Sequence, residues 1–334
     1  MDVYVVIGLG RSGTSTITRS LQALGVDLGD QTTGNLNAKG SFEDFDVSRV
    51  INRRVLEALN YSWKNMALTD LAVDHEKLIL LKAKAVAMLN QRLQKTKRFA
   101  FKAISTAKML PFWQDVFRTL NVNDHYIIAL RNPLAAAFSY QRINGADIEL
   151  SLLQWLMHMI PAIERTAHRN RIVVHFDALL QSPEKEMQRM QTQLNISMLS
   201  DAEEKNKFIH EFLDVKLKHY DSTVQDLNAH SAMKVAPLCV KMYSLLWRVS
   251  KDEISFESDE FVTNWKCLRE EFDALHPLYS YIEVLLTKNK SLERQIRGIR
   301  KSIAWKLSYP LRLLDQSLRA RRRKSREKRK LLIA

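Results

Sequence analysis

Short runs of β-branched and aromatic residues recur along the chain, and each is followed by apolar residues at helical spacing. The first run, at 3–7, precedes a segment at 14–24 in which Ile17, Leu21 and Leu24 share one helical face. Later runs lie at 98–104, 125–130 and 171–176, and the helical patterns that follow them lie at 109–120, 133–142 and 177–194. Strands that alternate with helices predict a doubly wound, mostly parallel α/β sheet flanked by helices.

The remainder of the chain divides into a loop-like part and a helical part. Residues 26–45 are rich in Gly, Asn, Thr and Asp, which predicts a long loop at the carboxyl end of the first strand, where open parallel sheets bind ligands. Residues 200–289 have a helical pattern with few motifs. We expect one α/β domain at 1–289 and a separate, helical C-terminal extension at 290–334.

The C-terminal extension carries nearly all of the net charge. It holds 16 Lys and Arg residues against three acidic residues, so +13 of the formal charge of +14 lies there. The nearly neutral body gives no electrostatic argument for nucleic-acid binding, and the basic run lacks the interleaved aromatic residues of a single-strand binder.

An apolar stripe runs through the start of this extension. Four aliphatic residues fall on one face of a predicted helix: Leu292, Ile296, Ile299 and Ile303. Basic residues fill most of the other positions, and Trp305 and Tyr309 follow. This pattern is typical of a helix that lies on an anionic membrane surface. A solvated, partly disordered tail is the alternative.

The cysteine content and the hydropathy of the chain indicate in which cellular compartment the protein is expected. Cys239 and Cys267 give neither a disulfide framework nor the spacing of a metal site, which favours a reducing environment. No apolar run has the length of a bilayer span, and no signal-peptide pattern precedes the first strand. We therefore expect a cytoplasmic protein, at the inner face of the cytoplasmic membrane if the extension binds lipid.

Candidate chemistry gathers where the first strand ends. The stretch GLGRSGTS at 8–15 places glycines, a guanidinium and three hydroxyls between a strand and a helix. Backbone N–H groups and the positive end of the helix dipole make such a turn an anion site. The candidate anion-binding residues are Arg11, Ser12, Gly13, Thr14 and Ser15.

Two well-known phosphate loops fit this stretch only in part. Its glycine spacing matches a dinucleotide-binding turn, but residues 26–40 cannot easily form the second strand that carries the acidic ribose ligand. A Walker A loop needs lysine where Thr14 stands, and a later strand should end in an acidic residue where this chain has Arg131. The chain therefore lacks the diagnostic residue of the dinucleotide-binding turn and that of the Walker A loop.

A second motif follows the strand at 125–130. In LRNPLAAAFS, Arg131 ends the strand and Ser139 comes eight residues later on the next helix. Together with Arg-Ser-Gly-Thr, this motif resembles the sulfotransferases, which use 3′-phosphoadenosine 5′-phosphosulfate (PAPS). The resemblance implies a P-loop-type fold, with 11–15 holding the 5′-phosphosulfate and Arg131 and Ser139 holding the 3′-phosphate. A guanidinium fork and a hydroxyl suit a dianion.

Further segments resemble bacterial sulfotransferase-like proteins of cell-surface glycan pathways. The segment at 37–63 is similar to their Lys-Gly-aromatic-Glu region, and SIAWKLSYPLR at 302–312 is similar to a basic element of glycan-assembly proteins. Weaker landmarks lie at 109–113, 152–156, 173–190 and 217–222. One departure is clear: the relatives usually have Lys-Asp-Pro-Arg where this chain has Lys102 followed by Ala-Ile-Ser.

The resemblance implies sulfuryl transfer, a loose in-line displacement that depends on positioning and on charge stabilisation. Arg11 and Lys102 would neutralise the bridging oxygen, so no metal is expected, although Lys102 fits a solvated surface lysine equally well. Glu43 is the first candidate for the general base.

Other residues are alternative candidates for the general base. If the acidic stretch at 43–46 caps the helix that begins near Ser48, Glu43 is merely solvated and Asp44 or Asp46 would serve. Three histidines have no supporting context: His75, His125 and His158.

These motifs favour a PAPS-dependent sulfotransferase that acts on a carbohydrate hydroxyl, in a bacterial surface glycan or its lipid-linked precursor. A P-loop nucleotide kinase or nucleotidase, and a non-catalytic scaffold of glycan assembly, are the alternatives.

Overall fold

The computed structural model describes residues 1–30, 40–66, 76–196, 202–214, 218 and 220–312. Within them, four strands form one sheet in the order β2-β1-β3-β4, and every pairing is parallel. The strands are β1 (Asp2–Ile7), β2 (Arg98–Lys102), β3 (Asn123–Leu130) and β4 (Asn170–His175). The predicted α/β class with a parallel sheet is therefore confirmed.

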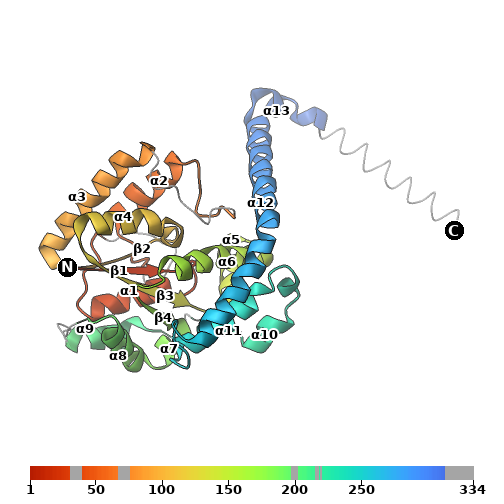
Figure 1. The fold of residues 1–334 in the computed structure, drawn as a ribbon. Coiled ribbons are helices and arrows are strands. Elements are labelled where there is room, and N and C mark those ends of the chain that lie inside the picture. Colours follow the sequence, from red (N-terminus) through yellow and green to blue (C-terminus); the bar gives the residue numbers. More distant parts are fainter. Residues whose placement is uncertain (31–39, 67–75, 197–201, 215–217, 219, 313–334) are drawn as a thin grey trace. The chain divides into compact units, whose positions relative to one another are not determined.

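The helices lie on both faces of the sheet (Figure 1). Those nearest the sheet are α1 (Thr14–Ala23), α3 (Ile79–Thr96), α4 (Leu110–Leu120), α5 (Pro133–Asn144), α6 (Ile148–Arg165), α7 (Phe176–Gln181), α8 (Pro183–Gln193) and α11 (Leu238–Ser250). The others are α2 (Arg53–Ala58), α9 (Ala202–Asn206), α10 (Val224–Ala229), α12 (Asp259–Lys301) and α13 (Ile303–Leu307).

Alternation of side chains along the strands divides the core into two layers. Tyr4 and Val6 of β1 pack with Ile17 and Leu21 of α1 on one face of the sheet. On the other face, aromatic rings of β2 and α4 meet, with the centroids of Phe101 and Trp113 4.9 Å apart. Because both faces are covered, the strands are nearly continuous apolar runs, which is why the sequence pattern predicted them.

The strand order creates a switch point between β1 and β3. The chain passes from β1 to β2 on one side and then to β3 on the other, so the carboxyl ends of β1 and β3 are adjacent, with Ile7 beside Ile128. Loops that leave neighbouring strands in opposite directions open a crevice there. Both predicted anion motifs begin at this edge.

Two helix predictions are corrected by the structure. Residues 177–194 form two helices, because Ser182 leaves the helical conformation (φ −142°, ψ 65°) before Pro183 and separates α7 from α8. The apolar face predicted in the C-terminal extension does not lie on one helix: α12 ends at Lys301, and the Ser302 hydroxyl accepts the N–H of Trp305 to start α13. Ile303 therefore belongs to the second helix.

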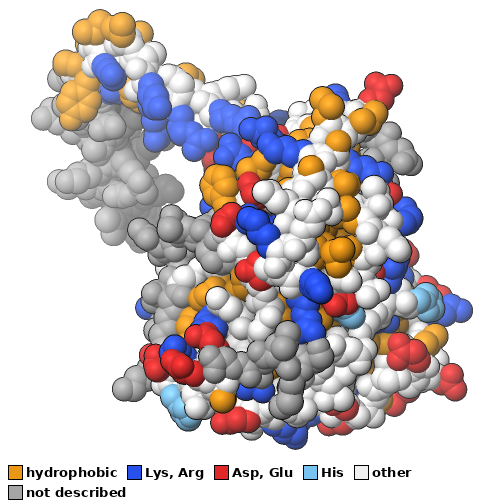
Figure 2. Space-filling view, turned by 90° about the vertical axis from the view of Figure 1, so that its left-hand side faces the viewer, with side chains coloured by type: hydrophobic (Ala, Val, Ile, Leu, Met, Phe, Trp, Pro, Cys, Tyr) orange, Lys and Arg blue, Asp and Glu red, His pale blue; other side chains and the backbone are white. Residues whose placement is uncertain are grey.

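The chain separates into two compact units, Met1–Pro277 and Leu278–Ala334, and α12 contributes to both. The predicted boundary at 289 and 290 falls inside α12, and the division at that point stays a prediction. In Figure 2 the α13 end of the second unit presents hydrophobic side chains next to Lys and Arg. No described helix has the length and hydropathy needed to cross a membrane.

Candidate functional site

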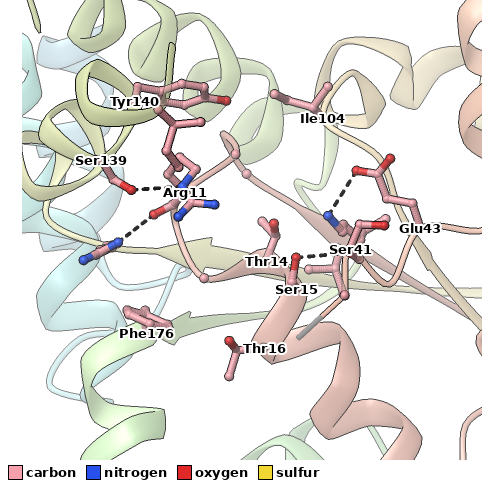
Figure 3. Close-up of a pocket in the computed structure, with 18 of the residues that line it drawn as sticks. Arg11, Thr14, Ser15, Thr16, Ser41, Glu43, Ile104, Ser139, Tyr140 and Phe176 are labelled. Carbon is pink, nitrogen blue, oxygen red and sulfur yellow. Dashed lines mark hydrogen bonds and ion pairs between the residues drawn. The ribbon is translucent and has the colours of Figure 1, made fainter. Parts of the chain in front are cut away.

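A pocket with a volume of about 440 Å³ lies in the first unit, at the carboxyl ends of β1, β2 and β3 (Figure 3). Six cationic side chains contribute to its lining: Arg11, Arg49, Lys102, Arg131, Arg142 and Lys218. Among the described lining residues the acidic ones are Glu43 and Asp214. An excess of positive charge around a pocket of this size favours a small anionic ligand.

The glycine turn between β1 and α1 forms one wall of the pocket. Gly13 adopts a left-handed conformation (φ 83°), and a Cβ there would lie 2.2 Å from a ring carbon of Phe176. Arg11 is also left-handed (φ 68°), which is uncommon for a residue with a side chain and is often found at functional sites. No described side chain caps α1, whose first N–H groups have no intrahelical acceptor.

Arg131 connects the second motif to this turn. One guanidinium nitrogen donates to the carbonyl oxygen of Arg11 at 3.0 Å, and the other donates to the carbonyl oxygen of Tyr220 at 3.0 Å. The guanidinium lies 4.9 Å from the centre of the Phe176 ring. The two anion motifs thus face one pocket.

Ser139 lies on the same side of the pocket but contacts Arg11. The Arg11 Nε donates to its hydroxyl at 2.9 Å, as Figure 3 shows. Burial lowers the pKa of both Arg11 and Arg131, and each is further lowered by a neighbouring guanidinium. The Arg11 and Arg131 guanidinium groups are both partly removed from water, so an anion bound between them would be favoured.

Lys102 and Glu43, predicted separately, form an ion pair. The Lys102 ammonium donates to a Glu43 carboxylate oxygen at 3.1 Å, from the end of β2 to the loop before α2. Burial lowers the pKa of Lys102, the Glu43 carboxylate opposes that shift, and Arg11 adds to it. Lys102 is therefore a buried pocket residue and not a solvated surface lysine.

The hydroxyls of the glycine turn have different surroundings. Thr14 lines the pocket, and the Ser15 hydroxyl donates to the carbonyl oxygen of Ser41 at 3.1 Å, which holds the loop at 40–43 against α1. Ser12, predicted to bind the cofactor, is fully buried and its side chain is not among the pocket lining.

The alternative carboxylate bases face away from the pocket lining. Asp44 is buried and accepts the N–H groups of Val47 and Asp30, and it pairs with Arg92 at 3.2 Å. Asp46 also pairs with Arg92, at 3.3 Å. These contacts hold both carboxylates at the start of a π-helix, Asp46–Asn52, which leads into α2. Glu43 is the acidic residue of 43–46 that lines the pocket.

His125 and His158 are not among the residues that line the pocket. His125 stacks on Tyr4 with ring centroids 4.8 Å apart, near the amino ends of the strands. His158 is buried in α6, and burial together with the Lys108 ammonium lowers its pKa to about 3. His75 lies outside the described residues.

The pocket contains residues that the sequence analysis missed. Phe176, Tyr140 and Ile104 line it, and Lys218 reaches it while bonded to Asp177 at 3.0 Å. Phe176 directly follows β4, so its place at the shared edge of the sheet was predictable. Lys218 belongs to the weaker landmark at 217–222, but that pattern did not mark it as a pocket residue.

No known family model and no curated protein matches this chain. Solved structures that are similar to this chain include the sulfotransferase domain of the Synechococcus PCC 7002 olefin synthase and a sulfotransferase domain from the curacin biosynthetic pathway. The first is 14% identical with a TM-score of 0.40 and covers 82% of this chain and 94% of its own. The second is also 14% identical with a TM-score of 0.40, covering 72% and 96%. At this identity and TM-score, neither structure carries an argument about the function of this chain.

Proposed function

We propose that this chain is a sulfotransferase that transfers the sulfuryl group of PAPS to a hydroxyl group. One observation carries the proposal: Arg131 donates at 3.0 Å to the carbonyl oxygen of Arg11, so two anion-binding motifs border the same pocket. A nucleotide with phosphate groups at both the 5′ and 3′ positions would satisfy both motifs at once.

The pocket residues fit such a donor. The glycine turn supplies backbone N–H groups that would bind an anion. Position 13 requires glycine, because a Cβ there would meet Phe176. Arg11 and Thr14 would hold the 5′ group, and Arg131 and Ser139 would hold the 3′-phosphate. The predicted contribution of Ser12 would come from its backbone, because its side chain is buried.

Glu43 and Lys102 would carry the chemistry. Glu43 would take the proton of the acceptor hydroxyl while the hydroxyl oxygen forms its bond to sulfur and the bond from sulfur to the 5′-phosphate oxygen breaks. Lys102 and Arg11 would stabilise the negative charge on that departing oxygen. The ion pair at 3.1 Å fixes one Glu43 oxygen, so the second would face the acceptor.

For the acceptor we propose a carbohydrate hydroxyl of a bacterial surface glycan or of its lipid-linked precursor. The support is the sequence resemblance at 37–63 and 302–312. Ala103, which stands where the resembled pattern has Asp, lines the pocket, as does Ile104 in place of the Pro. We therefore expect an acceptor site less polar than that of the resembled proteins.

The test is an assay of the full chain with radiolabelled PAPS and surface glycan in the presence of a metal chelator. We expect a labelled sulfate ester and release of 3′-phosphoadenosine 5′-phosphate (PAP). Binding of PAPS without transfer to any glycan hydroxyl would instead support a scaffold. Binding of ATP that needs magnesium, with no binding of PAPS, would support a kinase or nucleotidase and overturn the proposal.

A further inference from the structure

The second unit carries a regular apolar stripe that the pocket does not use. In α12, an aliphatic residue recurs every seven positions: Leu278, Leu285, Leu292 and Ile299. Each is about half exposed, with exposed fractions of 54%, 47%, 46% and 55%. A globular protein rarely leaves a row of leucines open to water along a helix, so the row has the character of an interface.

The positions between these residues complete a heptad pattern. Four residues after each of the first three come Ile282, Asn289 and Ile296. With the seven-residue series at d and this second series at a, the stripe extends over three heptads, starting directly after Pro277. Between 287 and 301 the apolar residues fall at a and d positions alone, whereas between 278 and 286 further apolar residues flank the seam. A seam of a and d residues is narrower than the apolar face of a helix packed on a globular core and is typical of a coiled coil.

We propose that residues 278–301 of α12 form a parallel, two-stranded coiled coil with a second copy of this chain. Isoleucine at a and leucine at d is the combination that favours two strands. A single asparagine at an a position specifies register and dimerisation at some cost in stability, and Asn289 occupies such a position in the middle of the seam.

The flanking charges fit the parallel arrangement. Lys288 takes a g position and Glu293 the following e position. In a parallel dimer the g residue of one helix lies beside the next e residue of its partner, so Lys288 of each copy would meet Glu293 of the other. Two symmetric pairs of opposite charge would result. Two parallel copies are therefore complementary in charge at these positions.

The membrane prediction uses part of the same stripe, at Leu292, Ile296 and Ile299. An interfacial helix needs a broad apolar face, whereas these residues form a narrow seam with a seven-residue repeat and a central asparagine. The pattern therefore favours a protein partner over a lipid surface for α12.

The mass of the full chain in solution tests the proposal, by size-exclusion chromatography with light scattering. We expect twice the chain mass of 38.8 kDa for the wild type and a monomer for the double variant Leu285→Glu with Leu292→Glu. The matched control is Val284→Glu with Ser291→Glu, which places the same charges one residue earlier, at c positions off the seam. This control should remain a dimer.

Orientation is tested by a disulfide. With Cys267→Ser as background, Ile299→Cys should form an intermolecular disulfide on mild oxidation, because only a parallel, in-register pair brings the two copies of this position together. A monomeric wild type, an equal effect of both double variants, or absence of the disulfide would overturn the proposal. A monomer that partitions onto vesicles of anionic lipid would support the membrane surface instead.

Discussion

At the residue scale, the ion pair between Lys102 and Glu43 is the most specific feature of the pocket. The two side chains lie 59 positions apart in sequence and meet at 3.1 Å. The sequence pattern proposed each as a catalytic residue, but it could not show that one holds the other, because the contact depends on how the loop before α2 packs over β2. Because this ion pair holds Glu43 in the pocket, a substitution of Glu43 is the most direct test of the proposed base.

We expect Glu43→Gln to lower turnover by roughly 10²–10⁴-fold, because the amide cannot take the proton from the hydroxyl group of the acceptor. Binding of PAPS should be retained, since the phosphate contacts come from other residues. Initial rates with radiolabelled PAPS and calorimetric binding of PAP measure the two effects separately.

The matched control for this variant is Asp46→Asn. Asp46 is three residues away and contacts Arg92 instead of the pocket, so turnover should stay within a few-fold of the wild type. If Asp46→Asn were as inactive as Glu43→Gln, the base would have been assigned to the wrong carboxylate.

At the element scale, the turn between β1 and α1 depends on its backbone conformation. We expect Gly13→Ala to reduce the free energy of unfolding by at least about 2 kcal/mol and to abolish PAP binding, because alanine disfavours a positive φ and its Cβ would meet Phe176. Urea unfolding and calorimetry provide the measurements.

Gly298→Ala is the comparison for that variant. Gly298 lies in α12 with no neighbouring atom within 4 Å of an added Cβ, so alanine there should be neutral or stabilise by about 0.5–1 kcal/mol. A Gly13→Ala protein as stable as Gly298→Ala would contradict the role given to the turn.

The burial of His158 in α6 predicts a pH dependence of stability. Its pKa is about 3 in the folded chain and near 6.5 when exposed, so between these values the unfolded state binds the extra proton. The free energy of unfolding should therefore fall as the pH drops from 6.5 to 3, by on the order of 4 kcal/mol from this group.

His158→Leu should flatten that part of the profile, which is followed by urea unfolding at successive pH values. The slope is the readout, so a general loss of stability in the variant does not affect the comparison. An unchanged slope would mean that His158 is protonated in the folded chain.

The elements were predictable because the strands are buried on both faces and are therefore apolar throughout. The edge of the sheet at which the candidate site residues lie was predictable too, since parallel strands end at the same edge. What the pattern missed has a tertiary origin: Arg92 on α3 engages Asp44 and Asp46, and Lys218 enters the pocket from a distant segment. The break at Pro183 has a local cause, because proline disfavours the helical conformation of the residue before it.

At the scale of the whole molecule, the described pocket lining lies within Met1–Pro277, whereas the proposed seam lies in the second unit. The double variant Leu285→Glu with Leu292→Glu should therefore bind PAP with the affinity of the wild type, measured by calorimetry. If the double variant lost both dimerisation and affinity for PAP, the two units would depend on each other.

The central claim is that one pocket holds both phosphate groups of a doubly phosphorylated adenosine nucleotide. Its most direct test is calorimetry without metal, comparing PAP with adenosine 5′-phosphate for the wild type and for Arg131→Ala, with circular dichroism to check the fold. A charge-assisted hydrogen bond contributes about 2 kcal/mol, so we expect the wild type to prefer PAP by about 30-fold or more. The variant should lose most of that preference. Equal affinity of the wild type for both nucleotides, or an unchanged preference in a folded variant, would contradict the account.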